Sequence, residues 1–146
     1  MKLVIDASMA LAWFFERSEA SEAALADRVL ATLPDWEAIV PVLWHAEVAN
    51  ALLIGERRGV ASEAQVVDYM SRLLALPIAT DDVLVALRRD FVMALAREHG
   101  LTAYDATYLE LALRLGASLA TFDPELAAAM RRAGGAVFGD ALAESP

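Results

Sequence analysis

The chain has 146 residues, of which 58% are hydrophobic and none is cysteine. A chain of this size can bury enough surface to fold without disulfides or a structural zinc, so we expect one domain over residues 1–146. The formal net charge of −9, from 12 Lys and Arg against 21 Asp and Glu, argues against a broad basic face for nucleic acid.

The mean hydropathy of +0.44 is high for a soluble domain. Charges nevertheless interrupt every apolar run before the roughly 18 residues that a membrane-spanning helix needs. The first apolar run is interrupted by Asp6, and no convincing signal-peptide cleavage site follows it. We therefore expect a cytoplasmic protein with no membrane span, part of whose apolar surface is covered by another chain.

Short apolar runs alternate with helical segments along the whole chain. In chain order we expect a strand at 2–6, helices at 8–15 and from about 18–21 to 33, a strand at 36–41, helices at 42–58 and from 62, a strand at 77–80, helices at 81–98 and 102–115, a strand at 118–121, a helix from 124 and a last strand at 136–138. This alternation predicts the α/β class with a mostly parallel central sheet. The last six residues are expected to fray.

Several predicted helices begin with a capping signal. Ser62 and Gln65 have the spacing of a capping box, which predicts a helical hairpin with the preceding helix. Thr80 and Thr102 are expected to cap the two helices after that hairpin. Asp123 stands directly before a proline at the first position of the last helix.

Two acids lie at or just after the carboxyl ends of predicted strands, at the edge where open parallel sheets bind their ligands. These acids are Asp6 and Asp123. Each also has a structural interpretation, because Asp6 would stabilise the turn beside Ser8 and Asp123 would cap the helix that follows. Neither residue identifies a site by itself.

Glu47 lies inside the predicted helix at 42–58 and has no partner for an intrahelical ion pair. Its neighbours four residues away in each direction are Leu43 and Ala51. The same face of the helix also carries Asn50. We expect the Glu47 carboxylate to point toward the edge of the core.

Asp105 lies on an apolar face of the predicted helix at 102–115, together with Tyr108. Glu110 and Arg114 form an i,i+4 pair that we place on the opposite, solvated side of that helix. A structural alternative stays open for Asp105, because Thr102 and Asp105 also have the spacing of a capping box.

If these four carboxylates converge at one site, their charges repel one another. Two unit charges ~4 Å apart repel by about 4 kcal/mol at an effective dielectric near 20, which is large beside a total stability of about 5–15 kcal/mol. Protonation or a divalent cation must then neutralise the site. No cysteine is present and the two histidines lie in no metal-ligand spacing, so Mg²⁺ or Mn²⁺ is favoured over zinc. Such an ion can activate a water for phosphodiester hydrolysis.

Four segments together resemble the PIN-domain nucleases, and their order and spacing are similar to those of the VapC toxins of toxin–antitoxin pairs. The resemblance implies a three-layer α/β/α fold and an endoribonuclease that uses Mg²⁺ or Mn²⁺. It covers nearly the whole chain. The segments are Leu3-Val4-Ile5-Asp6-Ala7-Ser8, His45-Ala46-Glu47-Val48-Ala49-Asn50, Tyr104-Asp105-Ala106 and Leu119-Ala120-Thr121-Phe122-Asp123.

The resemblance also assigns expected roles to individual residues. Asp6, Glu47 and Asp105 match the core metal-binding acids of the family, and Asp123 matches a more variable fourth acid. Small hydroxyl residues near the site could orient a carboxylate or a water. The supporting residues are Ser8 and Thr121, to which we add Asn50 on the face of Glu47. Phe122 departs from the pattern, because relatives often carry a polar residue there.

The partners implied by the resemblance are an RNA substrate, a small VapB-type antitoxin that blocks the carboxylates, and a second copy of the chain in a homodimer. Two other functions stay open. One is a phosphohydrolase with Asp6 as nucleophile, although Asp6-Ala7-Ser8 lacks a second Asp two positions on and no lysine is well placed. The other is an interaction module that has kept the fold and lost catalysis.

Overall fold

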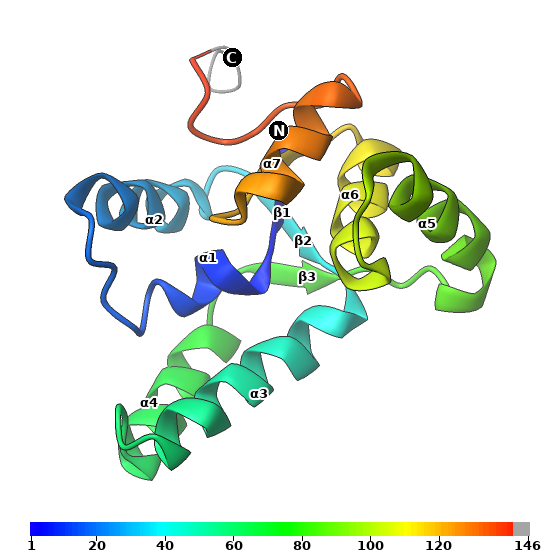
Figure 1. Cartoon of the computed structure of the whole chain (residues 1–146). Coiled ribbons are helices and arrows are strands. Elements are labelled where there is room, and N and C mark those ends of the chain that lie inside the picture. Colours follow the sequence, from blue (N-terminus) through cyan, green and yellow to red (C-terminus); the bar gives the residue numbers. More distant parts are fainter. Residues whose placement is uncertain (142–146) are drawn as a thin grey trace.

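The computed structural model describes residues 1–141. Our expectation that the last six residues fray therefore lies almost wholly outside the described residues. Helices and strands follow the predicted order (Figure 1). They are β1 (Lys2–Ile5), α1 (Ala7–Leu11), α2 (Ala20–Thr32), β2 (Glu37–Val40), α3 (Val42–Arg57), α4 (Glu63–Leu74), β3 (Ile78–Thr80), α5 (Val85–His99), α6 (Ala103–Leu115), β4 (Ser118–Ala120) and α7 (Pro124–Arg132).

The strands form one sheet in the order β3-β2-β1-β4. Every pair of neighbours is parallel, and Val4 of the central strand β1 aligns with Ile39 on one side and Leu119 on the other. The predicted parallel sheet is therefore confirmed. Because all strands run the same way, the residues that follow β1 and β4 meet at one edge of the sheet.

Helices cover both faces of this sheet (Figure 1). α1 packs against α3, which packs against α4 as the predicted hairpin, whereas α6 contacts α5, α7, β1 and β4. Right-handed connections put α1 to α4 on one face, because they join strands in the direction from β1 to β3, and α5 and α6 on the other, because they return to β4. The predicted three-layer α/β/α architecture is confirmed.

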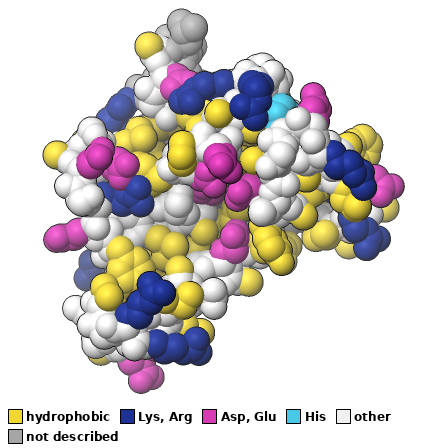
Figure 2. Space-filling model, in the orientation of Figure 1, with side chains coloured by type: hydrophobic (Ala, Val, Ile, Leu, Met, Phe, Trp, Pro, Cys, Tyr) yellow, Lys and Arg dark blue, Asp and Glu magenta, His cyan; other side chains and the backbone are white. Residues whose placement is uncertain are grey.

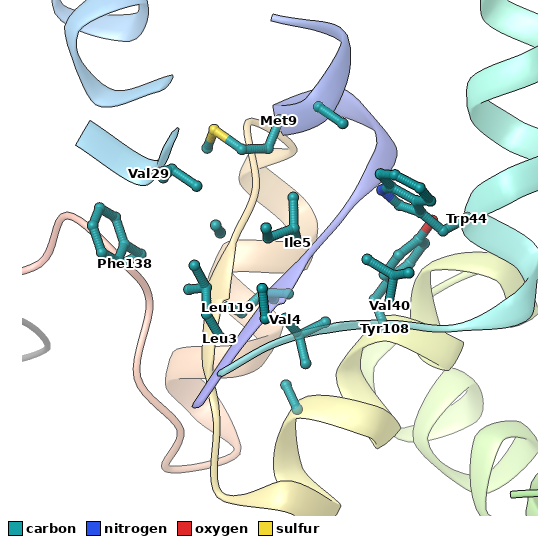
Figure 3. Packing of buried hydrophobic residues seen from close by; sticks show 14 of the residues in the cluster. Leu3, Val4, Ile5, Met9, Val29, Val40, Trp44, Tyr108, Leu119 and Phe138 are labelled. Atoms are coloured by element: carbon teal, nitrogen blue, oxygen red, sulfur yellow. The ribbon is translucent and has the colours of Figure 1, made fainter. Parts of the chain in front are cut away.

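The core lies on both sides of β1. Leu3, Val4 and Ile5 are fully buried, which explains why this strand is apolar at consecutive positions rather than at alternate ones. Leu119 of β4 and Val40 of β2 flank β1 on its two sides (Figure 3). This packing fixes the direction of β1 and hence the position of Asp6 at its end.

Two predicted capping signals are present as expected. The Ser62 hydroxyl accepts from the Gln65 amide at 3.2 Å, and the Ser62 amide donates to the Gln65 side chain at 2.9 Å. The Thr102 hydroxyl accepts from the backbone amide of Asp105 at 3.1 Å at the start of α6. These short-range contacts were predictable because both partners lie within three residues of each other.

Helix α1 ends at Leu11, whereas the apolar pattern predicted a helix to residue 15. The helix ends early because Trp13 and Phe15 form contacts with other helices. Trp13 Nε1 donates to the Ala26 carbonyl of α2 at 2.9 Å. The Phe15 ring lies on Gly55 of α3, where an added Cβ would stand 2.7 Å from the ring. The aromatic residues thus tie the α1–α2 connection to its neighbours.

Helix α5 begins at Val85, so the prediction that Thr80 caps a helix from residue 81 is wrong. Both residues are engaged elsewhere. The Thr80 hydroxyl hydrogen-bonds His45 Nε2 at 2.8 Å. The Asp81 amide donates to the Val40 carbonyl at 2.8 Å and so extends the sheet pairing past β3.

The predicted last strand at 136–138 is wrong as a strand. Its pairing is reduced to a single parallel bridge between Val137 and Leu119. The Leu119 amide donates to the Ala136 carbonyl and the Phe138 amide donates to the Leu119 carbonyl, both at 2.9 Å. Gly139 follows at a φ of 101°, a conformation that interrupts the extended backbone after Phe138.

No helix formed by residues 1–141 is both long enough and apolar enough to cross a membrane. The longest helix, α3, has 16 residues, whereas a span needs roughly 20. The cytoplasmic location stays a prediction.

Candidate active site

Asp6 directly follows β1 and caps α1, and its carboxylate is almost fully buried, with 5% of the residue exposed. Oδ1 accepts from the Ser8 hydroxyl at 2.7 Å and from the Met9 amide at 3.0 Å. Oδ2 accepts from the Thr121 hydroxyl. These donors hold the carboxylate in one orientation.

Ser8 and Thr121 connect Asp6 to the loop that follows β4. The Ser8 hydroxyl accepts from the Phe122 amide at 3.0 Å, and the Thr121 hydroxyl accepts from the Asp123 amide at 2.9 Å. Each hydroxyl thus donates to Asp6 and accepts from the 121–123 loop. The structure places both residues beside Asp6, and their part in catalysis stays a prediction.

Asp123 is the N-cap of α7. Its Oδ1 accepts from the amides of Glu125 at 2.9 Å and Leu126 at 3.3 Å, so the predicted capping contact is present. The charge of this carboxylate raises the pKa of both Asp6 and Asp105, which indicates that it lies near those two acids. The capping interpretation and a role in the acidic site are therefore compatible.

Glu47 contacts a partner that sequence reasoning missed. The hydroxyl of Tyr108, a residue buried in α6, donates to Glu47 Oε1 at 2.5 Å. Tyr108 thus joins α6 to α3. Its position three residues after Asp105 was the available signal. Asn50 is exposed on α3, one turn from Glu47.

Asp105 stands in the first turn of α6 and faces other acids. Burial raises the pKa of its carboxyl, and the charges of Asp123, Glu47 and Glu125 raise it further, while the Thr102 hydroxyl opposes the shift. Asp105 is therefore within electrostatic reach of acids from both α3 and the start of α7. The capping contact uses its backbone amide.

Burial raises the pKa of Asp6 to about 6, and the charge of Asp123 adds to this shift. Hydrogen bonds from Thr121, Ser8 and the Met9 amide oppose it. The charges that shift the pKa of Asp6 and Asp105 all come from acids. Figure 2 shows Asp and Glu side chains gathered at the centre of one face, with Lys and Arg around the rim. We call Asp6, Glu47, Asp105 and Asp123 the acidic cluster.

The side chains of residues 1–141 include no group of three His, Asp or Glu arranged so that it could hold a metal ion. Two of the carboxylates are engaged in internal hydrogen bonds instead, because Glu47 is bound to Tyr108 and Asp123 to an amide of α7. The donor set is nevertheless one of carboxylate and hydroxyl oxygens, which suits Mg²⁺ or Mn²⁺. The residues therefore fit a hard divalent cation by their chemistry, and their role as ligands stays a prediction.

The predicted solvated side of α6 is wrong, because α5 packs over it. Glu110 is only 5% exposed and accepts from Arg88 Nε at 2.7 Å and from Arg114 Nε at 2.9 Å. Arg114 also binds Asp81 at 2.6 Å. The predicted i,i+4 pair is present, but it belongs to a largely buried ionic network that fastens α5 to α6.

Comparison with known proteins identifies the family. The PIN domain family matches residues 3–131, and the chain belongs to this family. It is 37% identical over 130 residues to the protein named Ribonuclease VapC3 from Pyrobaculum aerophilum, which covers 87% of this chain and 93% of that protein.

Two solved structures share the fold. The crystal structure of PAE2754 from Pyrobaculum aerophilum has a TM-score of 0.65 and 28% identity, covering 88% of this chain and 79% of that one. The crystal structure of FitAcB from Neisseria gonorrhoeae has a TM-score of 0.59 and 20% identity, covering 93% of this chain and 96% of that one. The resemblance to PIN domains inferred from the sequence motifs is thus confirmed.

Proposed function

We propose that this protein is an endoribonuclease that depends on Mg²⁺ or Mn²⁺ and is the toxin of a type II toxin–antitoxin system. The acidic cluster at the carboxyl edge of β1 and β4 carries the proposal, because the charge of Asp123 raises the pKa of both Asp6 and Asp105 and no basic side chain is among the causes. The similarity to Ribonuclease VapC3 supports RNA as the substrate.

Asp6, Glu47, Asp105 and Asp123 are the residues that would hold the ion. When bound, the ion supplies activation of a water and stabilisation of the leaving oxygen. Asp6 is already oriented by Ser8, Thr121 and the Met9 amide. The Tyr108 hydroxyl holds the Glu47 carboxylate by donating a hydrogen bond to Oε1.

The phosphohydrolase alternative needs a free, nucleophilic carboxylate at Asp6. Both Asp6 oxygens accept hydrogen bonds within a buried site. Such bonds stabilise the carboxylate charge and reduce its nucleophilicity. The geometry at Asp6 therefore favours a role as an oriented ligand.

The proposed homodimer has a candidate surface on α5 and α6. Exposed apolar side chains gather there, and a cavity of about 310 Å³ with largely apolar walls opens between α5, α6 and the start of α3. Both features agree with the surplus of apolar residues in the chain. We propose that a second copy covers them. The exposed residues include Val42, Leu84, Val85, Leu87, Phe91, Met93 and Tyr104.

The proposed antitoxin is a small VapB-type protein that places a side chain against the acidic cluster. A cationic side chain there would offset the repulsion among the carboxylates and keep RNA out. Inhibition would then be relieved by substitution of that antitoxin residue. Cleavage assays with the purified pair would test this directly.

The function is tested with purified protein and a labelled single-stranded RNA. We expect cleavage in Mg²⁺ or Mn²⁺, none in EDTA, and none for Asp6→Asn or Asp105→Asn although both variants stay folded by circular dichroism. A folded wild-type protein that leaves RNA intact in both ions would contradict the proposal. That result would favour the interaction module.

A further inference from the structure

A nuclease with this site has an electrostatic problem at the place where RNA must bind. The chain carries a net charge of −9, and acids supply the charges that shift the pKa of Asp6 and Asp105. A metal ion neutralises the centre of such a site, but the flanking phosphates of the RNA also need a positive partner. An arginine at the rim of the acidic cluster would supply this positive partner.

Arg17, in the connection between α1 and α2, is held in a fixed position. Its Nε and Nη2 atoms contact Glu22 Oε2 at 2.7 and 2.6 Å. The centre of its guanidinium lies 4.2 Å from the centroid of the Phe122 ring. An ion pair on one edge and an aromatic ring on one face restrict the guanidinium more than a surface ion pair alone would.

Phe122 places this arginine at the acidic site. It stands between Thr121 and Asp123, and its amide donates to the Ser8 hydroxyl, which in turn donates to Asp6. The Phe122 ring is thus attached to the loop that supports Asp6, and Arg17 lies on that ring. A polar residue at position 122 would offer the guanidinium no ring to stack on.

The guanidinium retains donors for a ligand. About 31% of the Arg17 side chain is exposed. Within residues 1–141, the hydrogen-bond acceptor of Arg17 is Glu22, which binds the Nε and Nη2 atoms of the guanidinium. Nη1 and the outer N–H of Nη2 remain, and this pair has the geometry that binds two oxygens of a phosphate.

Three other arginines form ion pairs with acids outside the acidic cluster. Arg88 and Arg114 bind the buried Glu110. Arg131 pairs with Asp140 near the end of α7, eight residues after Asp123, which corresponds to roughly 12 Å along a helix. Arg17 differs from these in being attached to the loop that carries the fourth acid.

We propose that Arg17 binds a backbone phosphate of the RNA next to the scissile bond, with Phe122 and Glu22 as positioning residues for its guanidinium. This inference rests on the proposed function, because it concerns the substrate of that same site. Arg17 binds RNA without contacting the reacting atoms. Its loss therefore weakens binding and leaves the chemical step nearly unchanged.

The test compares Arg17→Gln with Arg131→Gln, which removes one positive charge away from the site. Both are assayed on a labelled single-stranded RNA in Mg²⁺ at several salt concentrations. We expect KM to rise about tenfold in Arg17→Gln, as the loss of a charge-assisted hydrogen bond implies, with kcat within about twofold. The slope of log KM against log salt should fall by about 0.7, the value for one single-strand phosphate contact. Arg131→Gln should match the wild type in all three quantities.

Equal KM values and salt slopes in the two variants would overturn the inference while leaving the proposed function intact. A fall in kcat with unchanged KM and slope would also overturn it, because that result indicates only a displaced loop. Fluorescence anisotropy of the same RNA in Ca²⁺ measures binding separately from cleavage. Weaker binding by Arg17→Gln than by Arg131→Gln supports the inference even where the wild type does not cleave, and equal binding contradicts it.

Discussion

The buried carboxylate of Asp6 should make the metal-free protein less stable as the pH rises. Its pKa is raised from 3.8 to about 6 in the folded state. The ionised form is therefore disfavoured by folding, and the cost is absent below about pH 4, grows through about pH 6 and is complete above it. A shift of about two pKa units corresponds to roughly 3 kcal/mol at pH 7.

The perturbation that removes this titration is Asp6→Asn. The asparagine oxygen can still accept from Ser8 and from the Met9 amide. Its NH₂ group faces Thr121, whose hydroxyl must turn to accept from it. That rearrangement adds an offset that does not depend on pH. Relative to the wild type, the free energy of unfolding of the variant should therefore rise by about 2.4 kcal/mol between pH 4 and pH 7.

The assay is urea denaturation in EDTA at half-unit steps from pH 4 to pH 7.5. Asp140→Asn serves as a control, because Arg131 lowers the pKa of the exposed Asp140. The stabilising effect of Asp140 is present above its unfolded pKa and is lost only as the pH falls toward its lower folded value. Its difference from the wild type should stay flat in this window. A flat or falling difference for Asp6→Asn would contradict the raised pKa of Asp6.

Three further changes have defined outcomes. Glu110→Gln should lower the free energy of unfolding by about 3 kcal/mol, because Arg88 loses its buried partner. A loss below 1 kcal/mol in urea denaturation, roughly the contribution of an exposed ion pair, would contradict this prediction. Gly55→Ala should cost about 1–3 kcal/mol, since its Cβ would lie 2.7 Å from the Phe15 ring, and an unchanged Tm would contradict that contact. Mg²⁺ at about 100 times its Kd should stabilise the wild type by about 2.7 kcal/mol. Calorimetry should find a much smaller rise for Asp105→Asn, and an equal rise would place the ion elsewhere.

The order of elements was predictable from local signals. Ser62 and Gln65 form their capping box within three residues of each other, and β1 carries an apolar run whatever surrounds it. The start of α5 was not predictable, because Thr80 and Asp81 form contacts with α3 and α6 instead of capping the helix. The buried position of Glu110 was missed for the same reason, since it requires knowing that α5 lies over α6.

The location of the acidic cluster was also predictable in part. The carboxyl ends of parallel strands share one edge, which brings Asp6 and Asp123 together once the topology is assumed. The bond from Tyr108 to Glu47 joins residues 61 positions apart, and the stacking of Arg17 on Phe122 crosses most of the chain. Such pairs follow from the packing of whole elements, which no local pattern encodes.

The acidic cluster should bind the divalent ion that RNA hydrolysis needs. Crystals soaked in Mn²⁺ would reveal the ion through anomalous scattering from the metal. We expect a Mn²⁺ peak between Asp6, Glu47 and Asp105, with Glu47 turned from Tyr108 toward the ion. A protein that cleaves RNA in Mn²⁺ while its crystals show no peak among these carboxylates, or show one elsewhere, would contradict this metal site.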